Sequence, residues 1–192
     1  MRKIDENKKE AITSAVFQLT EQVGLVGLSI GKVAKLAGVS PATIYIYYKD
    51  KMDMLSQILI SVKDILDDGQ EEAILSAANP LDQVRYFLDH LIRQWLKFPQ
   101  QAIFMRAALE SPNEIAQEGL DYSCKKAEPI MDLYNRLIST GKVKKISPDF
   151  VINWTAGAII SSLMLHFRAN TQPNEAEIQQ MIELSIDAIS LH

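Results

Sequence analysis

The segment Ser29–Lys51 constrains the fold of this chain more than any other, because two short helical patterns meet there at a single glycine. Before Gly38, apolar residues recur at spacings of three and four, which make one face of a helix. Glycine readily adopts the left-handed conformation that ends a helix, so we expect the chain to turn at Gly38. Ser40 then offers an N-cap hydroxyl, and Pro41 suits the first helical position because its missing N–H has no partner there. The pattern is typical of a helix-turn-helix, whose second helix enters the major groove of DNA.

A helical wheel, with about 100° per residue, separates the faces of the second helix. The face directed at the core consists of Ile44 and Tyr48. The opposite face, directed at a groove, consists of Ala42, Thr43 and Ile46. The flanks and the next turn carry phenols and ammonium groups that suit phosphate contacts, at Tyr45, Tyr47, Lys49 and Lys51. The groove face offers methyl groups and one hydroxyl, without Arg, Asn or Gln for bidentate contacts. We therefore hypothesise a site recognised through thymine methyl groups, Thr43 hydrogen bonds and DNA shape.

A family pattern runs through the first quarter to third of the chain. Its residues are Ile12, Ala15, Leu19, Gly24, Leu28–Ile30, Val33, Ala34, Ala37–Ser40, Thr43–Tyr45, Tyr47–Lys49, Lys51 and Leu55. With these residues the sequence resembles the TetR family of bacterial transcriptional repressors. The resemblance implies DNA contacts from Ser29, Ser40, Pro41, Ala42, Thr43, Tyr45, Tyr47 and Lys51, to which the wheel adds Ile46 and Lys49. The sequence departs from the family pattern at Thr20, Gly31, Ile46 and Tyr48. The other interpretation of the stretch is an ordinary helical hairpin with tyrosines in the core and solvated lysines.

The fold class follows from the apolar spacing and the breaks between helices. We predict an all-α protein of about nine helices, with an N-terminal three-helix helix-turn-helix head and a C-terminal helical body for ligand binding and dimerisation. The DNA-binding domain is expected over residues 1–51, with a connecting helix from about residue 51, and the body over residues 52–192. Helices are predicted at about 7–23, 81–98, 101–109, 115–138, 148–169 and 175–190, besides those already described. Val23 is expected in the apolar stripe of the first.

The last two predicted helices carry faces suited to pairing with a second copy of the chain. Small residues at Ala156–Ala158 allow close approach of another helix, and Ile178, Ile182, Ile186 and Ile189 form a stripe. Two such helices are expected to pack with their symmetry mates as a four-helix interface. Burial of the same faces inside one protomer is the alternative.

Charge and composition limit the other function classes. The chain has a net charge of −4, but residues 1–51 hold eight Lys or Arg against five Asp or Glu, and the rest twelve against nineteen. A mildly basic head on an acidic body is expected when only one end meets phosphate. The apolar stretch 151–167 is interrupted by polar residues, so we predict a buried helix and no membrane contact. The charged N-terminus lacks the apolar core of a signal peptide, which predicts a cytoplasmic protein.

Residues for chemistry are scarce in the sequence. His90, His166 and His192 lie far apart, and the single Cys124 cannot pair within the chain. We therefore predict no metal, no cofactor and no enzymatic activity.

The resemblance implies a small-molecule pocket in the body. The candidates are Phe87, His90, Leu91, Gln94, Trp95, Met105, Tyr122, Met131, Tyr134 and Trp154. His90 and Gln94, one helical turn apart, are the preferred polar pair in a pocket for a hydrophobic or aromatic effector. Each of these residues also suits plain core.

The predicted function is therefore a sequence-specific regulator of transcription that acts as a homodimer on a double-stranded, palindromic operator. A repressor released by its small-molecule effector is the expected mechanism. The alternative is a helical small-molecule-binding protein, or an adaptor, with a relict DNA-binding head.

Overall fold

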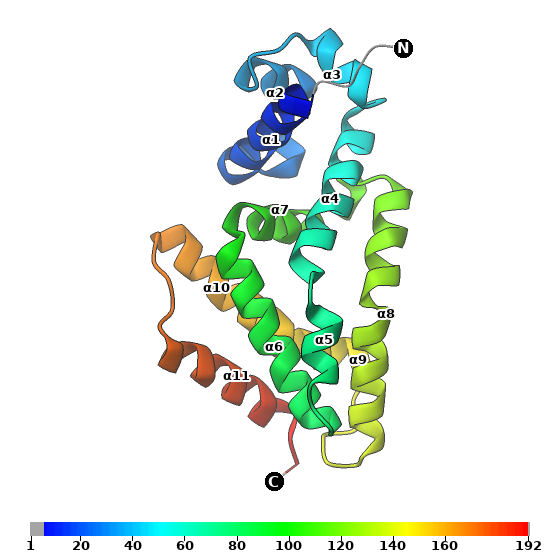
Figure 1. Ribbon diagram of the computed structural model, residues 1–192, viewed down its shortest axis with the longest axis vertical. Helices are drawn as coiled ribbons and strands as arrows, with labels where there is room; N and C mark the ends of the chain where they lie inside the picture. Colours follow the sequence, from blue (N-terminus) through cyan, green and yellow to red (C-terminus); the bar gives the residue numbers. More distant parts are fainter. Residues whose placement is uncertain (1–5, 192) are drawn as a thin grey trace. The chain divides into compact units, whose positions relative to one another are not determined.

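The computed structural model describes residues 6–191 (Figure 1), which form helices and a single isolated bridge between Val143 and Ser190. The predicted all-α class is confirmed. The chain divides into two compact units. The first contains Met1–Asp64 and Gln100–Cys124, and the second Ile65–Pro99 and Lys125–His192. This division concerns packing, and the functional boundary between residues 51 and 52 stays a prediction.

The first unit is built on three N-terminal helices, α1 (Glu6–Gly27), α2 (Ile30–Leu36) and α3 (Pro41–Tyr47). Helix α2 packs on both α1 and α3. The unit continues with α4 (Lys51–Asp67) up to Asp64, α7 (Pro99–Glu110) from Gln100, a 3₁₀ turn (Pro112–Glu114) and the start of α8 (Gln117–Ser139). Its fully buried side chains include Ile12, Leu25, Ile44, Met54, Leu55 and Phe104. The Phe104 ring meets that of Phe17 edge to face, with 5.6 Å between the centroids, so the later segment shares the core of the first helices.

The second unit surrounds helix α6 (Pro80–Lys97), which contacts α5 (Gln70–Leu75), α10 (Ala158–Ala169) and α11 (Glu175–Ile189). The rest of α8 and α9 (Pro148–Ile152) complete it. The fully buried Tyr134 lies edge to face with Phe87, at 6.4 Å between centroids. Its hydroxyl is 2.6 Å from Thr155 Oγ1, which donates to the carbonyl of Val151 at 2.7 Å. The Tyr134 O–H therefore donates to Thr155, and both hydroxyls are satisfied inside the core.

The predicted helix ends follow the expected capping chemistry. Gly24 and Gly38 both have φ of 67°, in the left-handed region, where glycine carries no steric cost. Asn79 caps α6 by accepting from the Asp82 amide at 3.0 Å, directly before Pro80. Val23, which we expected in the apolar stripe of the first helix, is 44% exposed. The turn at Gly24 shifts the register, so Leu25 takes the buried place instead.

Two further differences concern helix boundaries in the body. The short helix α5 follows the turn at Gly69 and was absent from the predicted elements. The segment predicted as one helix over residues 148–169 is interrupted by a π-helical turn, Asn153–Gly157. By length and composition alone, Pro148–Ala169 could cross a membrane, a test that the core helix of a folded protein also passes. Its residues Val151, Thr155, Ile159 and Leu163 are buried within the protein.

Candidate nucleic-acid interface

Local hydrogen bonds fix the geometry of the helix-turn-helix. Ser29 caps α2, its Oγ accepting from the Lys32 amide at 3.3 Å. Ser40 caps α3 in the same way, accepting from the Thr43 amide at 3.1 Å. Pro41 occupies the first helical position, as predicted. The Ser40 hydroxyl also lies 2.9 Å from Thr43 Oγ1, so the start of α3 presents a linked pair of hydroxyls. Each hydroxyl keeps hydrogen-bonding capacity for a further partner.

Helix α3 has one buried and one exposed face, as the wheel predicts. Ile44 and Tyr48 are 0% and 2% exposed, and burial raises the pKa of the Tyr48 phenol, an effect that the Thr13 side chain opposes. Tyr45 and Ile46 are 57% and 54% exposed. Ser29, Ser40, Pro41, Ala42 and Lys49 are also exposed, whereas Thr43 and Tyr47 are half-buried. An exposed apolar and phenolic face on a short helix suits contact with a partner surface.

The cations beside α3 differ in what they already contact. The Lys32 ammonium donates to the carbonyl of Gly27 at 2.7 Å. Lys49 is exposed, and its backbone amide donates to Asp53 at 2.7 Å. Lys51, predicted to contact phosphate, lies with its Nζ 2.7 Å from Glu114 Oε2. Glu114 could not be identified from the sequence, because it lies far from Lys51 in the chain and no local spacing joins the two residues.

The predicted ligand-binding residues do not share one environment. Those that are buried are Phe87, Trp95, Met105 and Tyr134. Those that are half-buried are His90, Leu91, Gln94, Tyr122 and Met131. Met105 and Tyr122 belong to the first compact unit and the other eight to the second. Trp154 is 56% exposed and lies on a groove away from the preferred polar pair. The ligand-binding role of the set stays a prediction.

His90 and Gln94 do lie together, in a groove of ≈ 230 Å³ between α5 and α6 that Asp89 also lines. Gln94 Nε2 donates to the carbonyl of Asp68 at 3.0 Å. Three buried polar atoms there have no hydrogen-bond partner among residues 6–191, namely Asp89 Oδ1, His90 Nε2 and Gln94 Oε1. Such atoms require water or a ligand, so this groove is the polar part of the predicted pocket region.

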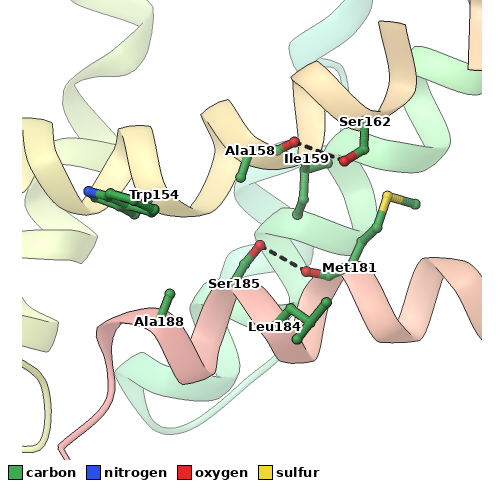
Figure 2. A pocket seen from close by; sticks show the side chains of 8 residues that line it. All are labelled: Trp154, Ala158, Ile159, Ser162, Met181, Leu184, Ser185 and Ala188. Atoms are coloured by element: carbon green, nitrogen blue, oxygen red, sulfur yellow. Dashed lines mark hydrogen bonds between the residues drawn. The ribbon is translucent and has the colours of Figure 1, made fainter. Parts of the chain in front are cut away.

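A second groove, of ≈ 250 Å³, runs between α10, the π-helical turn and α11 (Figure 2). Its lining residues are Trp154, Ala158, Ile159, Ser162, Met181, Leu184, Ser185 and Ala188. Ser162 and Ser185 donate to carbonyls of their own helices, at 3.1 Å and 2.8 Å, so their polarity is satisfied locally. Trp154 and Leu184 are 56% and 62% exposed. The surface is therefore apolar, with small residues that permit close approach of a helix.

The isoleucine stripe of the last helix does not form this surface. Ile178, Ile182, Ile186 and Ile189 are at most 4% exposed and belong to the core of the protomer. Our expectation that this stripe meets a second copy is wrong, because α11 turns it toward α6 and the π-helical turn. The opposite side of α11, at Leu184 and Ala188, is exposed.

Among residues 6–191, no three His, Cys, Asp or Glu side chains lie close enough together to hold a metal ion. Cys124 is a free, exposed thiol.

Comparisons with known proteins agree with this geometry. Residues 12–58 match the family model of bacterial regulatory proteins, tetR family. The chain is 28% identical over 101 residues to the HTH-type transcriptional regulator AcrR of Shigella flexneri, covering 52% of this chain and 47% of that protein. It is 25% identical over 105 residues to the HTH-type transcriptional regulator BetI of Rhizobium meliloti, covering 50% and 52%. The matched region thus spans about half the length of these curated relatives. The fold resembles a TetR family transcription regulator from Marinobacter aquaeolei, with a TM-score of 0.82 and 22% identity over 100% of both chains.

Proposed function

Since this chain belongs to the TetR family of bacterial regulatory proteins through its helix-turn-helix region, we propose that it is a sequence-specific DNA-binding regulator of transcription. The observation that carries the proposal is helix α3, which buries Ile44 and Tyr48 and exposes Tyr45 and Ile46. A helix whose outer face is apolar and phenolic, and which is followed by Lys49, has the composition of a recognition helix. The protein acts in the cytoplasm, where its DNA lies. The exposed face of α3 supports this function, and measurable affinity for a specific duplex would distinguish the protein from an adaptor with a relict head.

Recognition follows from the chemistry of that exposed face. Ala42, Thr43 and Ile46 contribute methyl groups for thymine, and the Ser40–Thr43 hydroxyl pair contributes hydrogen bonds to bases or phosphate. Tyr45, Tyr47 and the lysines contact phosphate, which positions the helix without selecting a sequence. We expect an operator rich in A·T pairs rather than one dominated by fixed guanines, since Arg is missing from the face.

The active species is a homodimer joined through the groove between α10 and α11, which gives two recognition helices for two half-sites. Because the dimer has twofold symmetry, its operator is a palindrome. The two half-sites of such dimers are roughly 34–36 Å apart. The protein represses transcription in this state. A small hydrophobic or aromatic effector that binds a different arrangement of the body lowers operator affinity by linkage.

A fluorescence-anisotropy titration with duplexes from the region upstream of the gene tests the DNA-binding function. Lys49→Ala is expected to weaken binding to every duplex and to reduce the salt slope by about one for each bound head. Thr43→Ala is expected to change the preference among duplexes instead. If the wild-type protein binds no duplex more tightly than random DNA at low salt, the regulator function is refuted.

A further inference from the structure

One ion pair places a carboxylate beside the proposed DNA-binding surface. Lys51 is the first residue of α4, one turn beyond the exposed face of α3. Its Nζ lies 2.7 Å from Glu114 Oε2, and the two side chains are 23% and 25% exposed. Glu114 ends the 3₁₀ turn that follows α7, so it comes from a part of the chain distant in sequence. The partial burial of both groups strengthens their attraction over that of a fully solvated pair.

The segment that carries Glu114 is anchored on both sides within the same compact unit. On the N-terminal side, Phe104 packs edge to face on Phe17, at 5.6 Å. On the C-terminal side, Gly119 abuts α4, since a Cβ atom there would lie 3.2 Å from the Ser56 Cα and closer still to its Oγ. The carboxylate is therefore held at the start of α4 by packing, and its position does not depend on the ion pair alone.

We propose that Glu114, by pairing with the Lys51 ammonium, keeps this group from binding phosphate and so lowers the DNA affinity of the head. This inference rests on the proposed DNA-binding function and adds a residue that tunes it. An ammonium group contributes to affinity when it neutralises a phosphate and releases a counterion, and a carboxylate at 2.7 Å competes for that role. The carboxylate also repels phosphate directly. Because Glu114 stands on the turn between α7 and α8, any displacement of this turn changes how strongly the head binds DNA.

The expected size of the effect follows from counterion release. Glu114→Gln keeps the side-chain shape but removes the charge, which frees Lys51 for one phosphate on each bound head. One added phosphate contact steepens the plot of log K against log salt by about 0.9 and raises affinity by up to about eightfold at 0.1 M salt. In a dimer with two bound heads, both effects double on the logarithmic scale.

The experiment compares Glu114→Gln with Glu110→Gln by anisotropy titrations at several salt concentrations on the same duplex. Glu110 belongs to the same segment and also forms an ion pair at 2.7 Å, but its partner is Arg106 on its own helix. The control therefore removes an equal charge without freeing Lys51. Lys51→Met and the double variant with Glu114→Gln complete a cycle, and thermal unfolding of each variant confirms that it is folded.

We expect tighter binding and a steeper salt slope for Glu114→Gln alone, with no gain from Glu114→Gln once Lys51 is replaced. Glu114→Asp, which keeps the charge, should stay nearer to wild type. Equal effects of Glu114→Gln and Glu110→Gln, a gain that persists in the Lys51→Met background, or weaker binding by Glu114→Gln would each overturn the proposal. Absence of DNA binding by the wild-type protein would refute the proposed function itself and this inference with it. Wild-type binding with unresponsive variants would refute this inference alone.

Discussion

If the dimer forms through the groove between α10 and α11, the loss of dimer stability on shortening one of its exposed side chains can be calculated. Leu184 is 62% exposed in the protomer, and complete burial of a leucine side chain contributes about 1.5–3 kcal/mol. Covering the exposed fraction is therefore worth about 1–2 kcal/mol for each copy. A twofold interface contains the residue twice, so Leu184→Ala should cost about 2–4 kcal/mol of dimerisation free energy. The dissociation constant of the dimer should rise by about 30- to 1,000-fold.

Sedimentation velocity over a wide range of protein concentrations measures this change directly. Leu75→Ala is the matched control, since Leu75 belongs to the same compact unit and is 66% exposed but does not line the groove. It should leave the dissociation constant unchanged. Equal shifts for the two variants, or a wild-type protein that is monomeric at all concentrations, would refute the assignment of this groove to the dimer.

Three further predictions concern the cap of α3, the packing at Gly119 and the buried hydroxyl of Tyr134. Ser40→Ala removes the cap of α3 and should lower the free energy of unfolding by about 1 kcal/mol, measured by urea denaturation. Gly119→Ala places a methyl group against Ser56 and should cost about 1–3 kcal/mol by overpacking, and Gly119→Ala with Ser56→Gly should recover part of this loss. Burial raises the pKa of Tyr134 above its ordinary value of 10.0, so the unfolded state releases this proton first and wild-type stability should fall as pH rises above 10. Tyr134→Phe should lose about 0.5–1.5 kcal/mol at neutral pH with its hydrogen bond to Thr155, and its stability should decline less steeply above pH 10.

The local structure of the head could be predicted from the sequence because each signal is local. A capping serine, a proline at the first helical position and a glycine with positive φ act within a few residues. The two faces of α3 follow from the helical repeat, which places Ile44 and Tyr48 together and Ile46 opposite. These features need no knowledge of the rest of the chain.

The surfaces of the body could not be predicted in the same way. A stripe of isoleucines along α11 shows that one face is covered, but the spacing does not say whether the cover is the same chain or another. In the structure the cover is the same chain: α6 and the π-helical turn pack on α11, so that Ile182 and Ile186 are buried and Leu184 stays exposed. The serines on the groove are misleading in the sequence as well. Ser162 and Ser185 are polar residues, but their hydroxyls donate to backbone carbonyls of their own helices and leave the groove apolar.

The Lys51–Glu114 pair shows which part of a functional assignment follows from a local motif and which part depends on long-range contacts. The sequence places an ammonium group one turn after α3, and on that ground alone Lys51 is predicted to contact phosphate. The fold adds a carboxylate at 2.7 Å from a distant turn, which makes the availability of that ammonium depend on the position of the turn. A motif therefore specifies which groups can reach DNA, whereas long-range packing decides how much of their charge is free to do so. The affinity of the head is then a property of the segment 100–124 as much as of the recognition helix.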